Sequence, residues 1–342
     1  MKLLILGGTK FLGRHLVEAA RARHHEVTLF NRGQSNPNVF PDVEKLIGDR
    51  DGNLEALKGR RWDAVIDTSG RLPRLVKDSI AVLANAVDHY TFFSTISAYD
   101  DRSVLGIDES AALAQLSDEK SEDVVADYRP LKARCERELN ERMPGRALIV
   151  RAGLIVGPYD DTGRFAYWPR RILRGGEVLA PGEPDRPVQF IHGRDLADWT
   201  IKMIENKGVG TYNVTGPEGS LTMGQFLEIC RHVTGSNARF TWVAESFLLE
   251  HEVIAFSELP LWLRKVSEGM LAVSIQKALA SGLILRSLES IIEETIAWDR
   301  SRLQEDDEYS RRLYDVEHKA GMAPEREKKL LAEWHARVDR AA

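Results

Sequence analysis

Short apolar runs alternate with amphipathic stretches over roughly the first 150 residues. The apolar runs predict strands at Lys2–Leu6, Glu26–Phe30, Val43–Ile47, Ala64–Asp67, Tyr90–Ser94 and Ala147–Arg151. The amphipathic stretches predict helices at Phe11–Arg23, Val76–Val87 and Tyr128–Glu141, with a helical turn at Leu54–Leu57. Strands that alternate with helices form βαβ units with right-handed crossovers. The sequence therefore predicts an α/β fold built on a doubly wound parallel sheet.

This alternation stops after Gly153, where glycine and proline become frequent. Loops are expected at 157–163 and 174–187, followed by a helix at Asp195–Glu205 and a strand at Thr211–Val214. Residues 222–298 read mostly as helix, and the charges of alternating sign beyond them indicate a solvated helical tail. We therefore expect three parts. They are a first domain of 1–155 plus about 188–216, a smaller, mostly helical substrate domain of 156–187 plus 217–300, and a charged helical tail of 301–342.

Composition narrows the class of protein. The 342 residues are 43% hydrophobic and 29% charged, which is typical of a globular protein with a substantial core. The net charge of −5 argues against a surface devoted to nucleic acid. With two cysteines the chain cannot build a disulfide framework or a Cys-x-x-Cys metal site, so we expect reduced thiols and no metal. No run is long and apolar enough to cross a bilayer, and a cytoplasmic location is expected.

The strongest local signal is the segment Gly-Gly-Thr-Lys-Phe-Leu-Gly, which directly follows the first strand and opens the first helix. The first glycine allows a tight turn, and the last lets the helix pack closely on the strand. A pyrophosphate would sit at the helix N-terminus, where free N–H groups and the helix dipole favour anions. The residues expected to bind a dinucleotide here are Gly7, Gly8, Thr9, Lys10, Phe11, Leu12 and Gly13.

Cofactor choice is normally set at the end of the second strand, where an acidic residue would bind a ribose 2′-hydroxyl. This chain has Asn31 followed by Arg32, and Lys10 replaces the middle glycine of the usual loop. These cations favour a 2′-phosphate, and so NADP(H) over NAD(H). Asp49, after the third strand, is either an adenine contact or a turn residue.

A second constellation follows the fifth strand, which ends in Ser94-Thr95. Tyr128 and Lys132 lie four residues apart at the start of a predicted helix and so face the same side. A phenol is a poor base at neutral pH, but a nearby ammonium lowers its pKa by favouring the phenolate. Lys132 would play that part and also hold the nicotinamide ribose, and Thr95 would donate to the reacting oxygen.

Taken together, these motifs resemble the short-chain dehydrogenase/reductase superfamily in its extended, sugar-nucleotide epimerase/dehydratase branch. The glycine loop, the Ser94–Tyr99 strand end, Tyr128 with Lys132, and Arg151–Pro158 match that branch in order and spacing. The match covers roughly residues 1–300, and Phe30–Gly33 resembles an atypical subgroup that includes epimerases, reductases and plastid RNA-binding proteins. The resemblance implies a Rossmann fold, a nicotinamide cofactor and hydride transfer.

Carried over by position, the resemblance makes Thr95 the catalytic hydroxyl, Tyr128 the base and Lys132 its partner. The 4,6-dehydratases of the branch have an Asp-Glu pair after the threonine, whereas this chain has Ile96 and Ser97. Without an acid or base there, elimination of water has no obvious proton carrier, which favours epimerase or simple oxidoreductase chemistry.

Substrate contacts are expected from positions beyond the sixth strand. Arg164 and Tyr167 belong to a segment that interleaves cations with aromatic rings, which suits a base and a diphosphate but also a helix with a solvated basic face. Arg186 and Gln189 lie where extended members often contact the substrate nucleotide, and Ser97 is a further candidate.

Two classes of function follow from these observations. The first is an NAD(P)-dependent epimerase or reductase that acts on a sugar-nucleotide-like or small alcohol substrate. The second is a non-catalytic NADP-sensing or RNA-binding module on the same fold, which the acidic net charge disfavours. Extended members of the branch that the chain resembles often pair through the helix that carries the tyrosine and the lysine, so we expect a homodimer. A monomer is the alternative, because Ala133 and Leu139 on this helix are set among charged residues.

Overall fold

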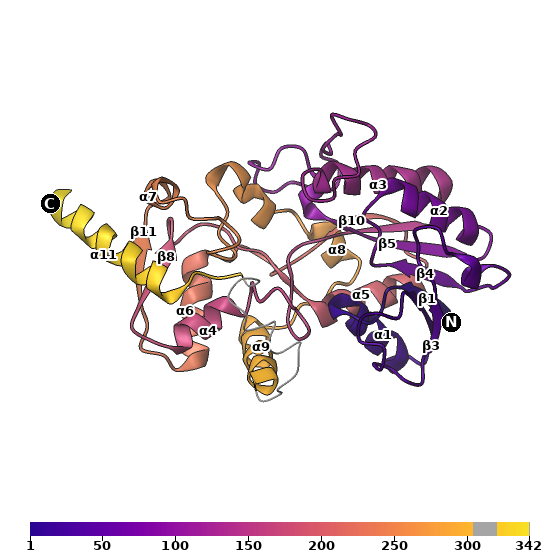
Figure 1. Cartoon of the computed structure of the whole chain (residues 1–342), viewed down its shortest axis with the longest axis horizontal. Coiled ribbons are helices and arrows are strands. Elements are labelled where there is room, and N and C mark those ends of the chain that lie inside the picture. The colour runs from indigo at the N-terminus through magenta and orange to yellow at the C-terminus, as the bar shows by residue number, and fades with distance from the viewer. Residues whose placement is uncertain (304–319, 342) are drawn as a thin grey trace. The chain divides into compact units, whose positions relative to one another are not determined.

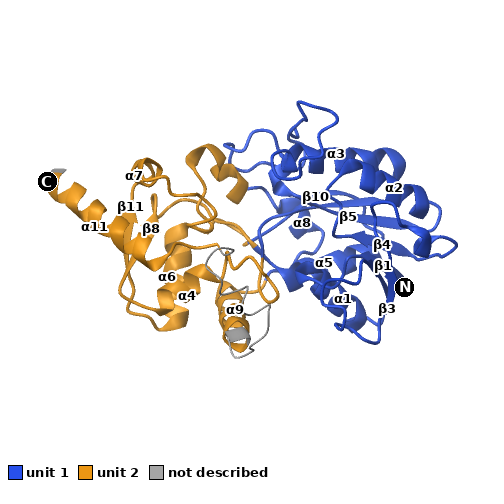
Figure 2. Cartoon of the chain, in the orientation of Figure 1, with its two compact units in different colours: residues 1–155, 191–216, 273–285 blue, residues 156–190, 217–272, 286–342 orange. Residues whose placement is uncertain are grey.

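The computed structural model describes residues 1–303 and 320–341. The described chain divides into two compact units, which Figure 2 distinguishes by colour. Unit 1 is Met1–Ile155, Ile191–Gly216 and Val273–Leu285. Unit 2 is Val156–Phe190, Pro217–Ala272 and Arg286–Ala342.

Unit 1 is built on a seven-stranded sheet in the order β10-β6-β5-β4-β1-β2-β3, and every neighbouring pair is parallel. Its strands are β1 (Lys2–Leu6), β2 (Glu26–Asn31), β3 (Glu44–Ile47), β4 (Ala64–Asp67), β5 (His89–Thr95), β6 (Ala147–Ala152) and β10 (Gly210–Val214). The chain moves outward from β1 to β3 and then returns to β4 on the other side of β1. This reversal confirms the predicted doubly wound, Rossmann arrangement, in which ligands bind at the carboxyl ends of the strands near β1 and β4.

Helices cover both faces of this sheet (Figure 1). Helices α1 (Phe11–Ala22) and α5 (Gly193–Glu205) pack together on one face, and α2 (Pro73–Leu83) and α3 (Tyr128–Arg142) on the other. Alternate residues of β1 supply the two cores. Leu3 and Ile5 join the cluster under α1 and α5, and Leu4 and Leu6 join the cluster under α2 and α3. Burial on both faces explains why the strand reads as an unbroken apolar run.

Unit 2 combines helices with a second, two-stranded parallel sheet made of β8 (Glu177–Pro181) and β11 (Arg239–Val243). Both strands correct the sequence prediction, which placed a loop at 174–187 and read 222–298 as mostly helical. Its longer helices are α4 (Tyr167–Leu173), α6 (Met223–Thr234), α7 (Glu245–Glu250), α9 (Leu288–Leu303) and α11 (Pro324–Ala341). The remaining short elements of the chain are η1 (Glu55–Leu57), η2 (Ile96–Ala98), β7 (Ile155–Val156), β9 (Ile191–His192), η3 (Lys265–Leu271) and α8 (Gln276–Ala280).

The structure draws the domain boundary differently from the sequence prediction at residues 273–285. This segment, expected in the second domain, belongs to unit 1 because α8 packs against β10. Ala278 and Leu283 are buried in the core under α1 and α5, and the Asn213 side chain donates to the carbonyl of Ser274 at 3.1 Å. Apolar burial therefore returns the chain to the first unit after it has built most of the second.

The described part of the predicted tail is also more than a solvated helix. Leu330 and Leu331 of α11 are buried, and Glu327 on the same helix is only 4% exposed. Its carboxylate accepts hydrogen bonds from Arg171 at 2.6 Å and from the backbone of Leu179 at 3.0 Å. Helix α11 therefore forms part of the core of unit 2, whereas residues 304–319 of the predicted tail lie outside the described residues.

Within residues 1–303 and 320–341, the structure has no helix that is both long and apolar enough to cross a membrane. Cys135 and Cys230 are both free and buried.

Candidate functional site

The glycine loop between β1 and α1 brings two backbone segments into direct contact. Gly7 and Gly8 have φ angles of 116° and 94°, which residues with a Cβ rarely adopt. Gly13 lies in the first turn of α1, and a Cβ added to it would fall 2.7 Å from the Cα of Gly8. The loop and the helix therefore touch through glycines, as the sequence predicts for a dinucleotide turn.

A cavity of about 450 Å³ opens against this loop. Its lining comes from residues 6–10, 30–35 and 48–50, together with Ser69 and Arg71. The first N–H groups of α1 lack intrahelical partners, so they and the helix dipole favour an anion next to the loop. The crowded glycine cradle and the uncapped end of the helix fit the diphosphate of a nicotinamide dinucleotide.

Several predicted cofactor residues line this cavity, and others lie in the helix that follows the loop. Thr9, Lys10 and Arg32 are part of the lining, and Lys10 and Arg32 are exposed. Leu12 is instead buried in the core, and the Phe11 ring packs edge-on against His15 with the ring centres 6.1 Å apart. Phe11 and Leu12 therefore hold the helix in place, while the loop itself faces the cavity.

Asn31 and Asp49 both line the cavity, and both also hold the backbone around it. The Asn31 amide donates to the carbonyl of Gly7 at 3.1 Å, and its oxygen accepts from the backbone of Gly33 at 2.8 Å. The Asp49 carboxylate accepts from the backbone of Asp51 at 3.0 Å, which is the turn role that the sequence left open. A contact between Asp49 and adenine stays a prediction.

The predicted catalytic residues lie on elements of unit 1 that pack together. Thr95 ends β5, and its hydroxyl oxygen accepts from the backbone of Ser97 at 3.1 Å, so that it caps η2. Helix α3 packs against both β5 and η2. The Arg129 guanidinium fastens this contact by donating to the carbonyls of Ser97 at 3.0 Å and Tyr99 at 2.6 Å. The start of the helix is thereby held next to the end of the strand.

Tyr128 and Lys132 differ sharply in exposure. Tyr128, at the first position of α3, is 36% exposed, whereas Lys132 is 5% exposed. The Lys132 ammonium donates to the carbonyl oxygens of Gly70 at 2.7 Å and Phe93 at 2.5 Å. Burial disfavours its charged form and lowers the pKa of Lys132 to about 8. A lysine with this pKa can change its charge near neutral pH, which is a common property of functional sites.

Two buried networks beside these residues were not foreseen from the sequence. In the first, Ser94 donates to Glu136, and Arg151 donates to the same carboxylate at 2.7 Å and to the Tyr99 hydroxyl at 2.9 Å. Ser94, the neighbour of Thr95 at the end of β5, is thus engaged in a structural network.

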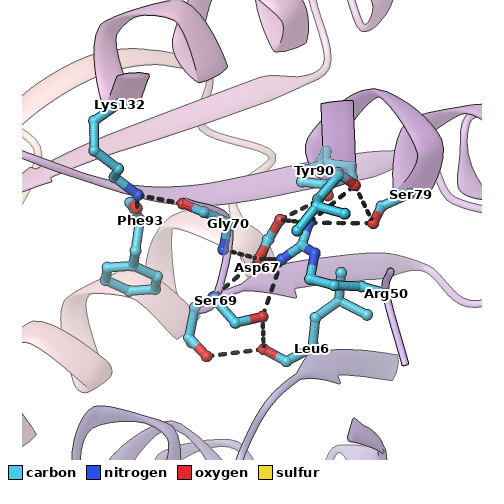
Figure 3. Close-up of polar contacts among 11 residues, drawn as sticks. Leu6, Arg50, Asp67, Ser69, Gly70, Ser79, Tyr90, Phe93 and Lys132 are labelled. Carbon is cyan, nitrogen blue, oxygen red and sulfur yellow. Dashed lines mark hydrogen bonds and ion pairs between the residues drawn. The ribbon is translucent and has the colours of Figure 1, made fainter. Parts of the chain in front are cut away.

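The second network centres on Asp67, at the carboxyl end of β4 (Figure 3). Its carboxylate is fully buried and pairs with Arg50 at 2.7 and 2.8 Å. A charged residue at the end of the apolar run Ala-Val-Ile-Asp was the signal in the sequence that could have pointed to it.

The remaining predicted substrate residues lie in unit 2, apart from Ser97 at η2. Arg164 lies over the Phe256 ring at 5.2 Å, and Tyr167 and Gln189 are buried. The Arg186 guanidinium pairs with Glu268 at 2.6 Å and with another glutamate, and donates to a backbone carbonyl. Binding a phosphate through Arg186 would require it to exchange these partners.

Comparison with known proteins places this site in context. The family model described as "NAD dependent epimerase/dehydratase family" matches residues 3–215. Chloroplast stem-loop binding protein of 41 kDa b of Arabidopsis thaliana is 25% identical over 253 residues, which are 68% of this chain and 63% of that protein. The match therefore spans less than two thirds of this relative's length.

Two further matches are similar in sequence or in fold. Epimerase family protein SDR39U1 of Bos taurus is 26% identical over 245 residues, which are 66% of this chain and 78% of that protein. Among solved structures, UDP-glucose 4-epimerase of Thermotoga maritima with UDP-glucose has a TM-score of 0.63 at 19% identity, covering 89% of this chain and 100% of that one. At this identity the structural likeness establishes the fold alone.

Proposed function

The chain belongs to the NAD dependent epimerase/dehydratase family, and on that premise we propose that it is an NAD(P)-dependent epimerase or reductase. One observation carries the proposal. A buried lysine follows Tyr128 by one helical turn, and both lie beside the Thr95 strand end in the unit that holds the glycine cradle. In this arrangement Tyr128 would transfer a proton while the glycine loop holds a dinucleotide.

Each of the three side chains has a defined part in this proposal. Tyr128 takes the proton from a substrate hydroxyl, and the positive charge of Lys132 favours the phenolate that this requires. Thr95 donates to the reacting oxygen and holds it in place. A bound nicotinamide would supply the hydride acceptor and donor. An epimerase would return the hydride to the other face of the carbon, whereas a reductase would release the changed cofactor.

We propose NADP(H) as the preferred cofactor. Arg32 and Lys10 are exposed at the cavity and are joined there by Arg71, which the sequence reasoning did not include. Asn31 occupies the place of the usual acidic residue, and its amide is engaged with the loop backbone. Cations beside an amide at the usual acidic position suit a 2′-phosphate.

The proposed substrate is a carbinol or carbonyl compound, either sugar-nucleotide-like or a small alcohol. The fold likeness to UDP-sugar epimerases supports the first choice, and the engagement of Arg186 by glutamates supports the second. Ile96 is buried in η2, and Ser97 follows it, so elimination of water lacks an acid–base pair at these positions. We also propose a cytoplasmic location, in keeping with the two free, buried thiols.

A homodimer remains a proposal, and its interface is not the pair of positions expected from the sequence. Ala133 and Leu139 are fully buried within the chain itself, with Leu139 in the core beneath α2 and α3. A dimer through α3 would therefore have to use its charged, exposed residues.

A second candidate function is a binding module without turnover, and one observation favours it. A relative of the chain is named as a stem-loop binding protein. A net charge of −5 is unfavourable for RNA binding, which depends on contacts with phosphates. Retention of a stem-loop RNA that weakens steeply with salt would support this second function.

The deciding experiment is a cofactor-reduction screen over sugar nucleotides and small alcohols with purified protein. For any substrate found, Tyr128→Phe should lower turnover by about 10²–10⁴, the usual worth of general acid–base catalysis, and leave the cofactor Kd unchanged. Tyr212→Phe is the matched control, because within the described part of the chain the Tyr212 hydroxyl donates to the carbonyl of Val209 alone, at 3.3 Å. A Tyr128→Phe enzyme with wild-type turnover would exclude the proposed base.

A further inference from the structure

The carboxylate of Asp67 is surrounded by hydrogen-bond donors at the carboxyl end of β4 (Figure 3). Arg50 donates to both of its oxygens, at 2.7 and 2.8 Å. The backbone N–H groups of Ser69 and Gly70 donate at 3.0 and 2.9 Å, and the Tyr90 hydroxyl donates at 3.1 Å. A carboxylate with this many donors is held in one position and stays ionised although it is fully buried.

On one side, the Arg50 member of this ion pair forms part of the wall of the cavity next to the glycine loop. Arg50 and Ser69 both line the cavity, and the Arg50 guanidinium also donates to the Ser69 hydroxyl at 3.0 Å. The same guanidinium reaches the Ser79 hydroxyl at 3.1 Å and the carbonyl of Leu75 at 3.3 Å. Arg50 thus ties the end of β3, the turn after β4 and helix α2 together.

On the other side, the same turn holds the Lys132 ammonium. The Gly70 carbonyl accepts from Lys132 at 2.7 Å, while the Gly70 N–H binds Asp67. A Cβ on Gly70 would lie 2.6 Å from the Phe92 ring and 3.0 Å from an Asp67 oxygen, so this turn is closely packed and has no space for a side chain here. Lys132 also lies 4.2 Å from the centre of the Phe92 ring. A single residue, Gly70, therefore connects the carboxylate with the ammonium.

Charged groups around Lys132 also couple its ammonium to the Arg50–Asp67 pair. Burial is the largest influence and lowers the pKa of Lys132 to about 8. Negative charge on Glu136 of α3 and on Asp67 of β4 opposes that effect, and the Arg50 cation adds to it. The neighbouring Cys135 thiol stays neutral in this range, because burial raises its pKa to about 12. Burial also disfavours the ionised form of Asp67, but the Arg50 cation, the Ser69 backbone donor and the Lys132 charge together outweigh this and keep the pKa of Asp67 below its ordinary value.

We propose that Asp67, held by Arg50, is a positioning residue for Lys132, so that the wall of the dinucleotide cavity and the ammonium form one connected unit. The inference rests on the proposed function in one respect, the role given to Lys132. Asp67 itself has no proposed contact with substrate or cofactor. It acts on Lys132 through the Ser69–Gly70 turn and through its own negative charge.

The test follows the titration of Lys132 in the full chain without cofactor. Protein carrying ¹³C-labelled lysine gives a Cε resonance whose shift reports protonation, and Lys132→Met identifies the signal. We expect Asp67→Asn to lower the midpoint of Lys132 by about one unit or more, because the ammonium loses a nearby negative charge. An unchanged midpoint in folded Asp67→Asn protein would overturn the proposal.

The control is Glu327→Gln, which removes a carboxylate from an ion pair of similar burial in unit 2. The side chains of Arg171 and Glu327 are 11% and 5% exposed, and those of Arg50 and Asp67 are 11% and 0% exposed. Glu327→Gln should lower the free energy of unfolding by about as much as Asp67→Asn does, and it should leave the titration midpoint of Lys132 unchanged. A shift of the same size in both variants would mean that the midpoint reports general loosening, which contradicts a specific role.

Arg50→Gln keeps the proposal testable if Asp67→Asn does not fold. It removes a cation that lowers the pKa of Lys132 and leaves Asp67 with its backbone donors, so the midpoint should rise. Lys132→Met gives an independent measurement, since hydrogen exchange at the Ser69 and Gly70 amides should accelerate when the turn loses the ammonium. An unchanged midpoint in the first variant, or unchanged exchange in the second, would overturn the proposal. These readouts need no substrate, so a failure of the Tyr128 proposal would not affect them.

Discussion

Gly13→Ala tests whether the glycine loop is the cradle for the cofactor. The added Cβ would lie 2.7 Å from the Cα and 2.8 Å from the nitrogen of Gly8. Both contacts are with backbone, so a change of rotamer cannot relieve them. Normal van der Waals separation requires the loop and α1 to move apart by about 0.7 Å.

Two effects on stability oppose each other in this variant. In an open helical position, alanine stabilises by about 1 kcal/mol relative to glycine. Forced overpacking costs about 1–3 kcal/mol, so we expect a net loss of up to about 2 kcal/mol. Cofactor binding should suffer more, because a displacement of this size stretches charge-assisted hydrogen bonds beyond their normal range. Losing one such bond, worth about 1.5–3 kcal/mol, weakens binding by about tenfold to a hundredfold.

Urea denaturation measures the first effect, and calorimetric titration with NADP⁺ and NAD⁺ measures the second. Gly145→Ala is the control, since Gly145 has a φ of 69° and no heavy atom of the described residues lies within 4 Å of its added Cβ. It should lose about 1–2 kcal/mol through backbone strain and bind both cofactors normally. A folded Gly13→Ala protein with wild-type affinity for both cofactors would refute the reasoning.

Two further predictions concern charge. Arg32→Ala should weaken NADP⁺ binding by about 1–3 kcal/mol and barely change NAD⁺ binding, as calorimetry would measure; equal losses for the two cofactors would exclude a contact with the 2′-phosphate. Burial raises the pKa of Asp160 from 3.8 to about 6, although Thr162 donates to it, so between these values the folded state holds a proton that the unfolded chain has released. The contribution of Asp160 to the free energy of unfolding should therefore fall by about 2 kcal/mol as the pH rises from about 4 to about 6. Urea titrations should show this fall in the difference between wild type and Asp160→Asn, because the other carboxyl groups contribute equally to both proteins; a constant difference would refute it.

The features that could be predicted from the sequence are those in which the residue types directly reflect the local backbone conformation or its burial. The strand Lys2–Leu6 was predicted with both ends correct, because burial on two faces leaves a continuous apolar run. Gly7, Gly8 and Gly13 indicated a close turn, because positive φ angles and missing side chains are properties of glycine itself. The spacing of Tyr128 and Lys132 likewise follows from helical geometry alone.

What the sequence could not predict depends on pairs of distant segments. Strand β8 lies among glycines and prolines that resemble a loop, and its partner β11 comes some sixty residues later. The apolar face of α11 is short, with Leu330 and Leu331 set among charged residues, so its burial depends on the surface that unit 2 offers. Parallel pairing and helix docking of this kind leave little signal in the local pattern.

The Arg50–Asp67 pair at the candidate site also depends on distant segments, and it could not be predicted for the same reason. Arg50 follows β3, which lies at the edge of the sheet, whereas Asp67 ends β4 on the far side of β1 and β2. Their meeting requires the chain after β3 to return across the carboxyl ends of the strands, which periodicity does not specify. A buried ion pair costs its own desolvation, and well-packed apolar residues would often give equal stability. Stability alone therefore gives little reason for a charge at Asp67. The position of the Ser69–Gly70 turn, with the cavity on one side and the Lys132 ammonium on the other, does give such a reason.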